Sequence, residues 1–133
     1  MKISKLNHIA IACRDLDKHL KLFGEIFGMP LGDVVEVPSQ GVKVAFIELP
    51  NVRIELIAPL DDRANLNKFL EKHGEGLHHI SLAVDDIKAA LIELSDKGVG
   101  AIDKEPRPGA DNRPVAFLHP KTTGGVLIEL EKD

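Results

Sequence analysis

The sequence predicts an α+β fold made of two tandem β-α-β-β-β modules, which pair into a curved sheet around a cavity. Three observations predict it: an internal repeat, a helical stripe of apolar residues after the first strand of each repeat, and strands whose two faces differ in side-chain size. We expect a single domain over residues 1–133, with repeats at about 5–60 and 76–131 joined by a helical linker. A chain of 133 residues is long enough for one such domain.

Three short segments recur in the same order along the chain. Residues 8–12 (HIAIA) match residues 79–83 (HISLA), residues 44–46 (VAF) match 115–117, and residues 54–56 (IEL) match 128–130. The first two offsets are 71 residues and the third is 74, which leaves room for a small loop insertion. One such match would mean little, but three collinear matches indicate a duplication.

The elements of each repeat follow from local patterns. Residues 5–13 and 77–84 are short apolar stretches rich in branched side chains, which is typical of strands. Helices follow, with Asp15 and Asp85 as expected N-caps and with Gly28 and Gly98 at their ends. Further strands are predicted at 33–37, 42–49 and 52–58, and at 99–102, 114–119 and 125–131; a linker helix is predicted at about 64–73.

Composition excludes several classes of protein. The chain is 44% hydrophobic and 29% charged, which is typical of a globular protein. Its formal net charge of -4 has the wrong sign for bulk attraction to nucleic acid or to anionic lipid, so neither partner is expected. The single cysteine, Cys13, excludes an intramolecular disulfide and is expected to be a small core residue. With no leader pattern or membrane-spanning stretch, we expect a cytoplasmic protein.

The two faces of the predicted strands differ in a consistent way. Bulky residues alternate with His8 in the first strand and with His79 in its repeat, and they flank Glu55 and Glu129 in the last strand of each repeat. If the bulky faces pack on the helices, these four residues share the opposite, concave surface. Imidazole and carboxylate donors suit a divalent transition metal, and burying two carboxylates without a cation would cost several kcal/mol per ion.

At this point the sequence resembles the vicinal oxygen chelate superfamily over nearly its whole length. Within it, three blocks are similar to methylmalonyl-CoA epimerases: residues 76–87 (GLHHISLAVDDI), 115–121 (VAFLHPK) and 125–130 (GVLIEL). The resemblance implies that His8, His79 and Glu129 bind the metal and that Glu55 takes the fourth position. It also implies a homodimer. We expect cobalt as the ion, with manganese, nickel or zinc as alternatives that the same donors accept.

The implied activity is metal-dependent epimerisation of methylmalonyl-CoA by α-proton abstraction through a metal-stabilised enolate. Glu129 and Glu55 are the candidate pair of catalytic bases, and Lys121 is a candidate contact for a phosphate of CoA. Some epimerases carry a glutamate where this chain has Val44, so one candidate base is missing here.

Two other functions remain open on the sequence alone. A glyoxalase I (lactoylglutathione lyase) would use the same metal and the same enolate chemistry on a glutathione hemithioacetal. A non-catalytic binding protein of the same fold would hold a small ligand in the same cavity without proton exchange. An extradiol dioxygenase is disfavoured, because Glu55 would add an anionic ligand where such enzymes leave positions open for oxygen and catechol.

Overall fold

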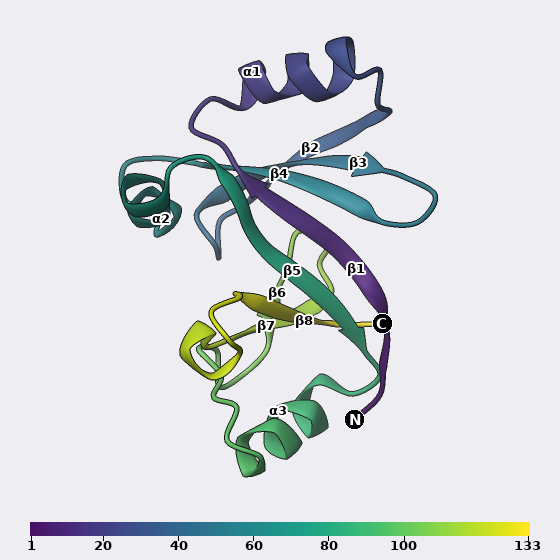
Figure 1. The fold of residues 1–133 in the computed structure, drawn as a ribbon, viewed down its shortest axis with the longest axis vertical. Coiled ribbons are helices and arrows are strands. Elements are labelled where there is room, and N and C mark those ends of the chain that lie inside the picture. Colours follow the sequence, from purple (N-terminus) through teal and green to yellow (C-terminus); the bar gives the residue numbers. More distant parts are fainter. The chain divides into compact units, whose positions relative to one another are not determined.

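The computed structural model describes residues 1–133. Its elements follow one another as a strand, a helix and three strands, then a linker helix, and then the same series again (Figure 1). Their bounds are β1 (Ile3–Ala12), α1 (Leu16–Leu20), η1 (Lys21–Ile26), β2 (Leu31–Val37), β3 (Val42–Glu48), β4 (Arg53–Pro59), α2 (Leu66–His73), β5 (Gly76–Val84), α3 (Ile87–Asp96), β6 (Arg107–Pro108), β7 (Pro114–Leu118), η2 (Pro120–Thr122) and β8 (Ile128–Lys132).

The hydrogen-bonded order of the strands is the same in the two repeats. The eight strands follow the order β2-β3-β4-β1-β5-β8-β7-β6. Reading outward from the first strand of each repeat gives β1-β4-β3-β2 and β5-β8-β7-β6, which are equivalent series. The α+β class that the sequence predicts is confirmed, and the equivalent strand order is what a duplicated unit would give.

The chain divides into two compact units, which are described separately. One unit contains Met1–His8 and His79–Asp133, and the other contains Ile9–His78. The division falls within β1 and β5, so each of these strands contributes residues to both units.

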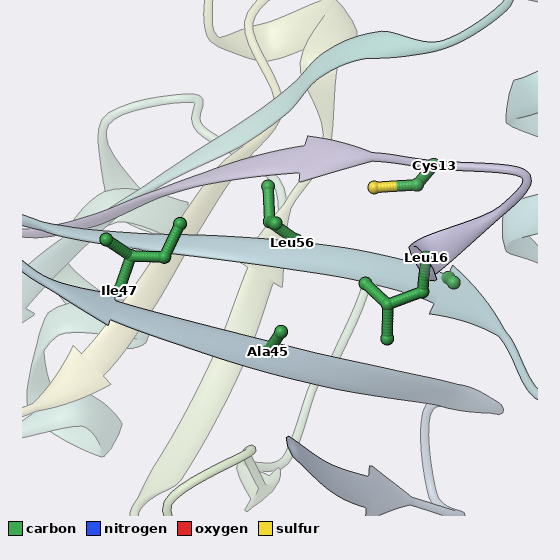
Figure 2. Packing of buried hydrophobic residues seen from close by; sticks show 6 residues of the cluster. Cys13, Leu16, Ala45, Ile47 and Leu56 are labelled. Atoms are coloured by element: carbon green, nitrogen blue, oxygen red, sulfur yellow. The ribbon is translucent and has the colours of Figure 1, made fainter. Parts of the chain in front are cut away.

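The unit of residues 9–78 packs α1 and η1 against one face of β3 and β4. Its core contains Cys13, Leu16, Ala45, Ile47 and Leu56, with Ala58 completing the buried cluster (Figure 2). The strand residues in this cluster alternate with those of the opposite face, as the sequence predicts. The predicted linker helix is present as α2, whose Leu66 and Leu70 are buried.

The helix that follows β1 differs from the prediction of one continuous α-helix. It begins at the Asp15 N-cap, whose carboxylate accepts from the backbone N–H of Asp17 at 3.0 Å, but it continues from Lys21 as the π-helix η1. A Cβ at Gly24 would overlap the Leu31 side chain, so this glycine lets the wider turn approach β2 closely.

The other unit packs α3 against β7 and β8. Its core contains Val84, Ile87, Ala90, Ala116, Leu118 and Leu130. The expected N-cap at Asp85 is wrong by one residue: Asp86 caps α3 by accepting from the N–H of Ala89 at 3.0 Å. Asp85 instead accepts from the N–H of Asp86 at 3.0 Å and of Lys2 at 3.4 Å, so it ties the residue before β1 to the start of the helix.

The second strand of the second repeat lies elsewhere than predicted. Residues 99–102 form only an isolated bridge between Ala101 and Leu118, because Val99 and Ala101 pack into the α3 core instead. The strand β6 is the dipeptide Arg107–Pro108, inside the segment expected to be a turn. It lies at the sheet edge, where a proline without an N–H is tolerated. The predicted strand at 125–131 begins only at Ile128.

Candidate metal centre

Three of the four predicted ligands come together in the unit of residues 1–8 and 79–133. His8 lies on β1, His79 on β5 and Glu129 on β8. Strands β5 and β8 are parallel and pair Ser81 with Glu129, which brings the carboxylate close to His79. All three side chains are buried, with 3%, 7% and 4% of their residues' surfaces exposed.

The strand faces separate as the sequence predicts. Leu82 and Val84 of β5 and Leu130 of β8 pack in the core with α3. His79 and Glu129 alternate with these apolar residues along their strands, so their side chains lie on the opposite face of the sheet. The helices therefore occupy the apolar face and leave the polar face to the cluster.

The donor atoms of this cluster are close to one another. The Nε2 atoms of His8 and His79 are 3.2 Å apart. The carboxylate of Glu129 places Oε1 3.3 Å from His8 Nε2 and Oε2 4.0 Å from His79 Nε2. One ligand atom from each residue can be chosen so that all of them lie within 4.8 Å of one another.

These distances fit a shared transition-metal ion. Two ligand atoms at about 2.1 Å from one ion are about 3.0 Å apart when they are neighbours and at most about 4.2 Å apart. The 3.2 Å between the two Nε2 atoms and the 3.3 Å from His8 Nε2 to Glu129 Oε1 fall within this range. The 4.0 Å from His79 Nε2 is to the other oxygen, Oε2, so both carboxylate oxygens face the histidines. Glu131, two residues after Glu129 on β8, is a second buried carboxylate, and a bound cation would offset the cost of burying both.

An aromatic side chain packs against His79, and a basic side chain packs on that aromatic ring. The ring of His79 meets the ring of Phe117 edge-on, with centroids 5.0 Å apart and an interplanar angle of 89°. The guanidinium of Arg107 lies over the Phe117 ring, 5.7 Å from its centroid. The Nε atom of Arg107 is 3.2 Å from a carboxylate oxygen of Asp103. Asp103 also accepts from the backbone N–H of Phe117 at 2.9 Å, so it holds both members of this stack.

Glu55, the fourth predicted ligand, belongs to the unit of residues 9–78. It is 5% exposed and lies on the face of β4 opposite the α1 core, as predicted. It pairs across the sheet with Phe46, and Arg53 Nη1 is 3.8 Å from its Oε2. The Arg53 guanidinium also lies 5.1 Å from the Phe46 ring centroid and 3.4 Å from a carboxylate oxygen of Glu48.

The structure also places the other residues that the sequence analysis considered for the site. Lys121 is exposed on η2, directly after β7. Val44, at the position of the missing glutamate, is buried on the same face of β3 as Phe46. His78 packs against Phe69 of α2 with ring centroids 4.6 Å apart, as expected of a structural histidine. Burial and repulsion from His73 lower the pKa of His78 to about 4.

Sequence reasoning missed the residues that support the site. Asn7 and Glu131 contact His8, and Phe117 contacts His79. Arg107 and Asp103 contact Phe117 in turn. Glu131 could have been found, because it has the same strand parity as Glu129. Arg107 could not, because its segment was expected to be a turn.

The comparisons with known proteins agree with this fold. Residues 7–117 match the Glyoxalase/Bleomycin resistance protein/Dioxygenase superfamily. The chain therefore belongs to this superfamily, several branches of which the sequence left open. No helix in the structure has the length and apolar character needed to cross a membrane.

Individual relatives show to which family within this superfamily the chain belongs. The ethylmalonyl-CoA/methylmalonyl-CoA epimerase of Cereibacter sphaeroides is 42% identical over 132 residues, covering 98% of each chain. The methylmalonyl-CoA epimerase of Streptomyces coelicolor in complex with 2-nitronate-propionyl-CoA is 32% identical, with a TM-score of 0.93 over 99% of this chain and 96% of that one. A methylmalonyl-CoA epimerase in complex with methylmalonyl-CoA and NH4+ gives the same values. The chain belongs to the methylmalonyl-CoA epimerase family.

Proposed function

We propose that the chain is a metal-dependent epimerase that inverts the α-carbon of methylmalonyl-CoA through an enolate. The observation that carries the proposal is the buried cluster of His8, His79 and Glu129, whose donor spacing suits one metal ion. The family supplies the substrate class, since its relatives are named for malonyl-type CoA thioesters and one was solved with methylmalonyl-CoA bound.

The proposed metal ligands are His8, His79, Glu129 and Glu55. A bound divalent ion would supply Lewis-acid stabilisation of the negative charge that develops on the substrate's oxygen atoms. Cobalt is our preferred ion, and manganese, nickel and zinc accept the same nitrogen and oxygen donors.

Epimerisation needs a proton to leave one face of the α-carbon and another to arrive at the opposite face. We assign these transfers to Glu129 and Glu55, the buried carboxylates that come from equivalent positions of the two repeats. A carboxylate held by a metal is a weakened base, so at least one of the two must be loosely held during turnover. Val44 supplies no third carboxylate at the position where some epimerases have one.

Lys121 is the proposed contact for a phosphate group of CoA. Its exposed ammonium on η2 is free to form a charge-assisted hydrogen bond with an anion from solvent. We also propose that the enzyme works as a homodimer in the cytoplasm; light scattering of the purified protein tests the dimer.

Deuterium exchange tests the proposed reaction directly. The metal-loaded protein is incubated with racemic methylmalonyl-CoA in deuterated water, beside a chelator-treated sample, and the α-carbon is followed by mass spectrometry. We expect deuterium to enter only in the metal-loaded sample. Without exchange in a sample shown to contain metal, a glutathione hemithioacetal is tested next, and failure there would leave a binding protein.

A further inference from the structure

The second ring nitrogen of His8 faces two buried oxygen-bearing side chains that the proposed reaction does not use. Asn7 Oδ1 is 2.7 Å from His8 Nδ1, and Glu131 Oε2 is 3.8 Å from the same nitrogen. Asn7 is 9% exposed and Glu131 is 2% exposed. The shorter distance is a direct hydrogen bond, while the longer one places a negative charge beside the ring.

The duplication shows that the fold does not require these two residues. Glu129 of the second repeat matches Glu55 of the first, so Glu131 matches Ile57, which is a buried aliphatic residue. In the same way Asn7 matches His78. The equivalent strand position therefore accepts an apolar side chain, and a carboxylate at 131 needs another explanation.

The chemistry of His8 supplies that explanation. Asn7 Oδ1 and the Glu131 carboxylate are both acceptors, so they favour the tautomer that carries its proton on Nδ1. The lone pair of Nε2 then faces His79 and Glu129, whose donor atoms lie 3.2 and 3.3 Å away. A carboxylate near the distal nitrogen also makes an imidazole a stronger metal ligand.

We propose that Asn7 and Glu131 are positioning residues for the metal site: Asn7 accepts the Nδ1–H of His8, and Glu131 adds negative charge that strengthens Nε2 as a ligand. The inference rests on the metal dependence in the proposed function, but it does not depend on which substrate the enzyme uses. It assigns a role to a buried carboxylate on β8 two residues beyond the proposed ligand Glu129.

Metal affinity of the purified protein tests the proposal without substrate. Cobalt(II) binding is measured by calorimetry for the wild type and for Glu131→Gln, Glu131→Leu and Asn7→Ala. We expect Kd to rise about tenfold for Glu131→Gln and Asn7→Ala, and up to about 100-fold for Glu131→Leu, in line with losses of outer-shell partners in other metal sites. The visible absorption of bound cobalt should also change, because the ring orientation of His8 is less constrained.

Leu130→Ala is the matched control. Leu130 neighbours Glu131 on β8 but packs in the core with α3, so the substitution lowers the melting temperature while leaving cobalt Kd unchanged below the transition. Equal affinities for all variants would overturn the proposal, as would an equal weakening in Leu130→Ala. If Glu131→Leu fails to fold, the isosteric Glu131→Gln decides.

The outcome is separable from that of the proposed reaction. Weaker cobalt binding in the variants together with no deuterium exchange in the wild type would keep the positioning role and reject the epimerase. Exchange in the wild type with unchanged binding in the variants would do the reverse.

Discussion

At the scale of single residues, the cluster of His8, His79 and Glu129 brings two imidazoles and one carboxylate together at buried positions. One donor atom from each residue can be chosen so that all lie within 4.8 Å of one another, and none of the three side chains is exposed. Metal binding and activity of single-residue variants therefore test the site more directly than measurements of overall stability do.

Replacing a proposed ligand should remove metal binding while preserving the fold. For His8→Ala and Glu129→Ala we expect cobalt Kd to rise by at least 100-fold and activity to be lost, because each substitution removes one of the few side chains that would coordinate the ion directly. Calorimetry measures binding, and far-ultraviolet circular dichroism verifies folding. Retained activity in both variants would contradict the shared-metal site.

Cys13 offers a residue-scale prediction about pH. Burial, assisted by the negative charge of Glu75, raises the pKa of the Cys13 thiol from 9.0 to about 12. The unfolded chain loses this proton above about pH 9 while the folded protein keeps it, so the free energy of unfolding falls as pH rises from 9 towards 12.

Urea denaturation at pH 8 and pH 10 measures this effect. The wild type should lose about 1 kcal/mol more than Cys13→Ala between the two values, since one pH unit beyond the unfolded pKa is worth about 1.4 kcal/mol. An identical pH dependence in the two proteins would mean that the thiol ionises as easily in the folded state as in the unfolded one.

At the scale of elements, the start of α3 distinguishes two adjacent carboxylates. Asp86 accepts from the N–H of Ala89 as the N-cap, whereas exposed Asp85 accepts from backbone groups outside the helix. We expect Asp86→Ala to lower the free energy of unfolding by about 1 kcal/mol, as loss of a helix cap does. Asp85→Ala serves as the comparison in the same urea titration, and an equal or larger loss there would show that Asp85 is the cap.

At the scale of the whole molecule, metal binding and stability are linked. The proposed ligands His8, His79 and Glu129 come from β1, β5 and β8, which are far apart in the chain. An ion that binds the folded protein but not the unfolded chain stabilises it by about 2.7 kcal/mol at a concentration 100 times Kd. For a chain of 133 residues this corresponds to a rise in Tm of about 10 °C.

Calorimetric melting with cobalt and with a chelator measures this stabilisation. The same pair of scans on Glu129→Ala is the control, and its two melting temperatures should coincide. A wild-type Tm that does not respond to cobalt would argue against a metal site built from folded strands.

Much of this molecule follows from the sequence because duplication and alternation are local signals. The repeat predicted the order of elements, and the alternation of bulky and small residues predicted which strand faces meet the helices. That parity, together with the residue types, placed His8, His79 and Glu129 on the face opposite the bulky residues. It also placed Glu55 on the equivalent face of its own repeat.

Contacts between distant residues decided what the sequence did not determine. The choice of Asp86 over Asp85 as the cap depends on where Lys2 meets the helix start, and the place of β6 depends on Val99 and Ala101 entering the α3 core. The surroundings of the two histidines are likewise tertiary: Asn7 is a neighbour of His8 in sequence, but Glu131 reaches it only through strand pairing. Alternation assigns a side chain to a face, whereas distances between donor atoms are set by packing.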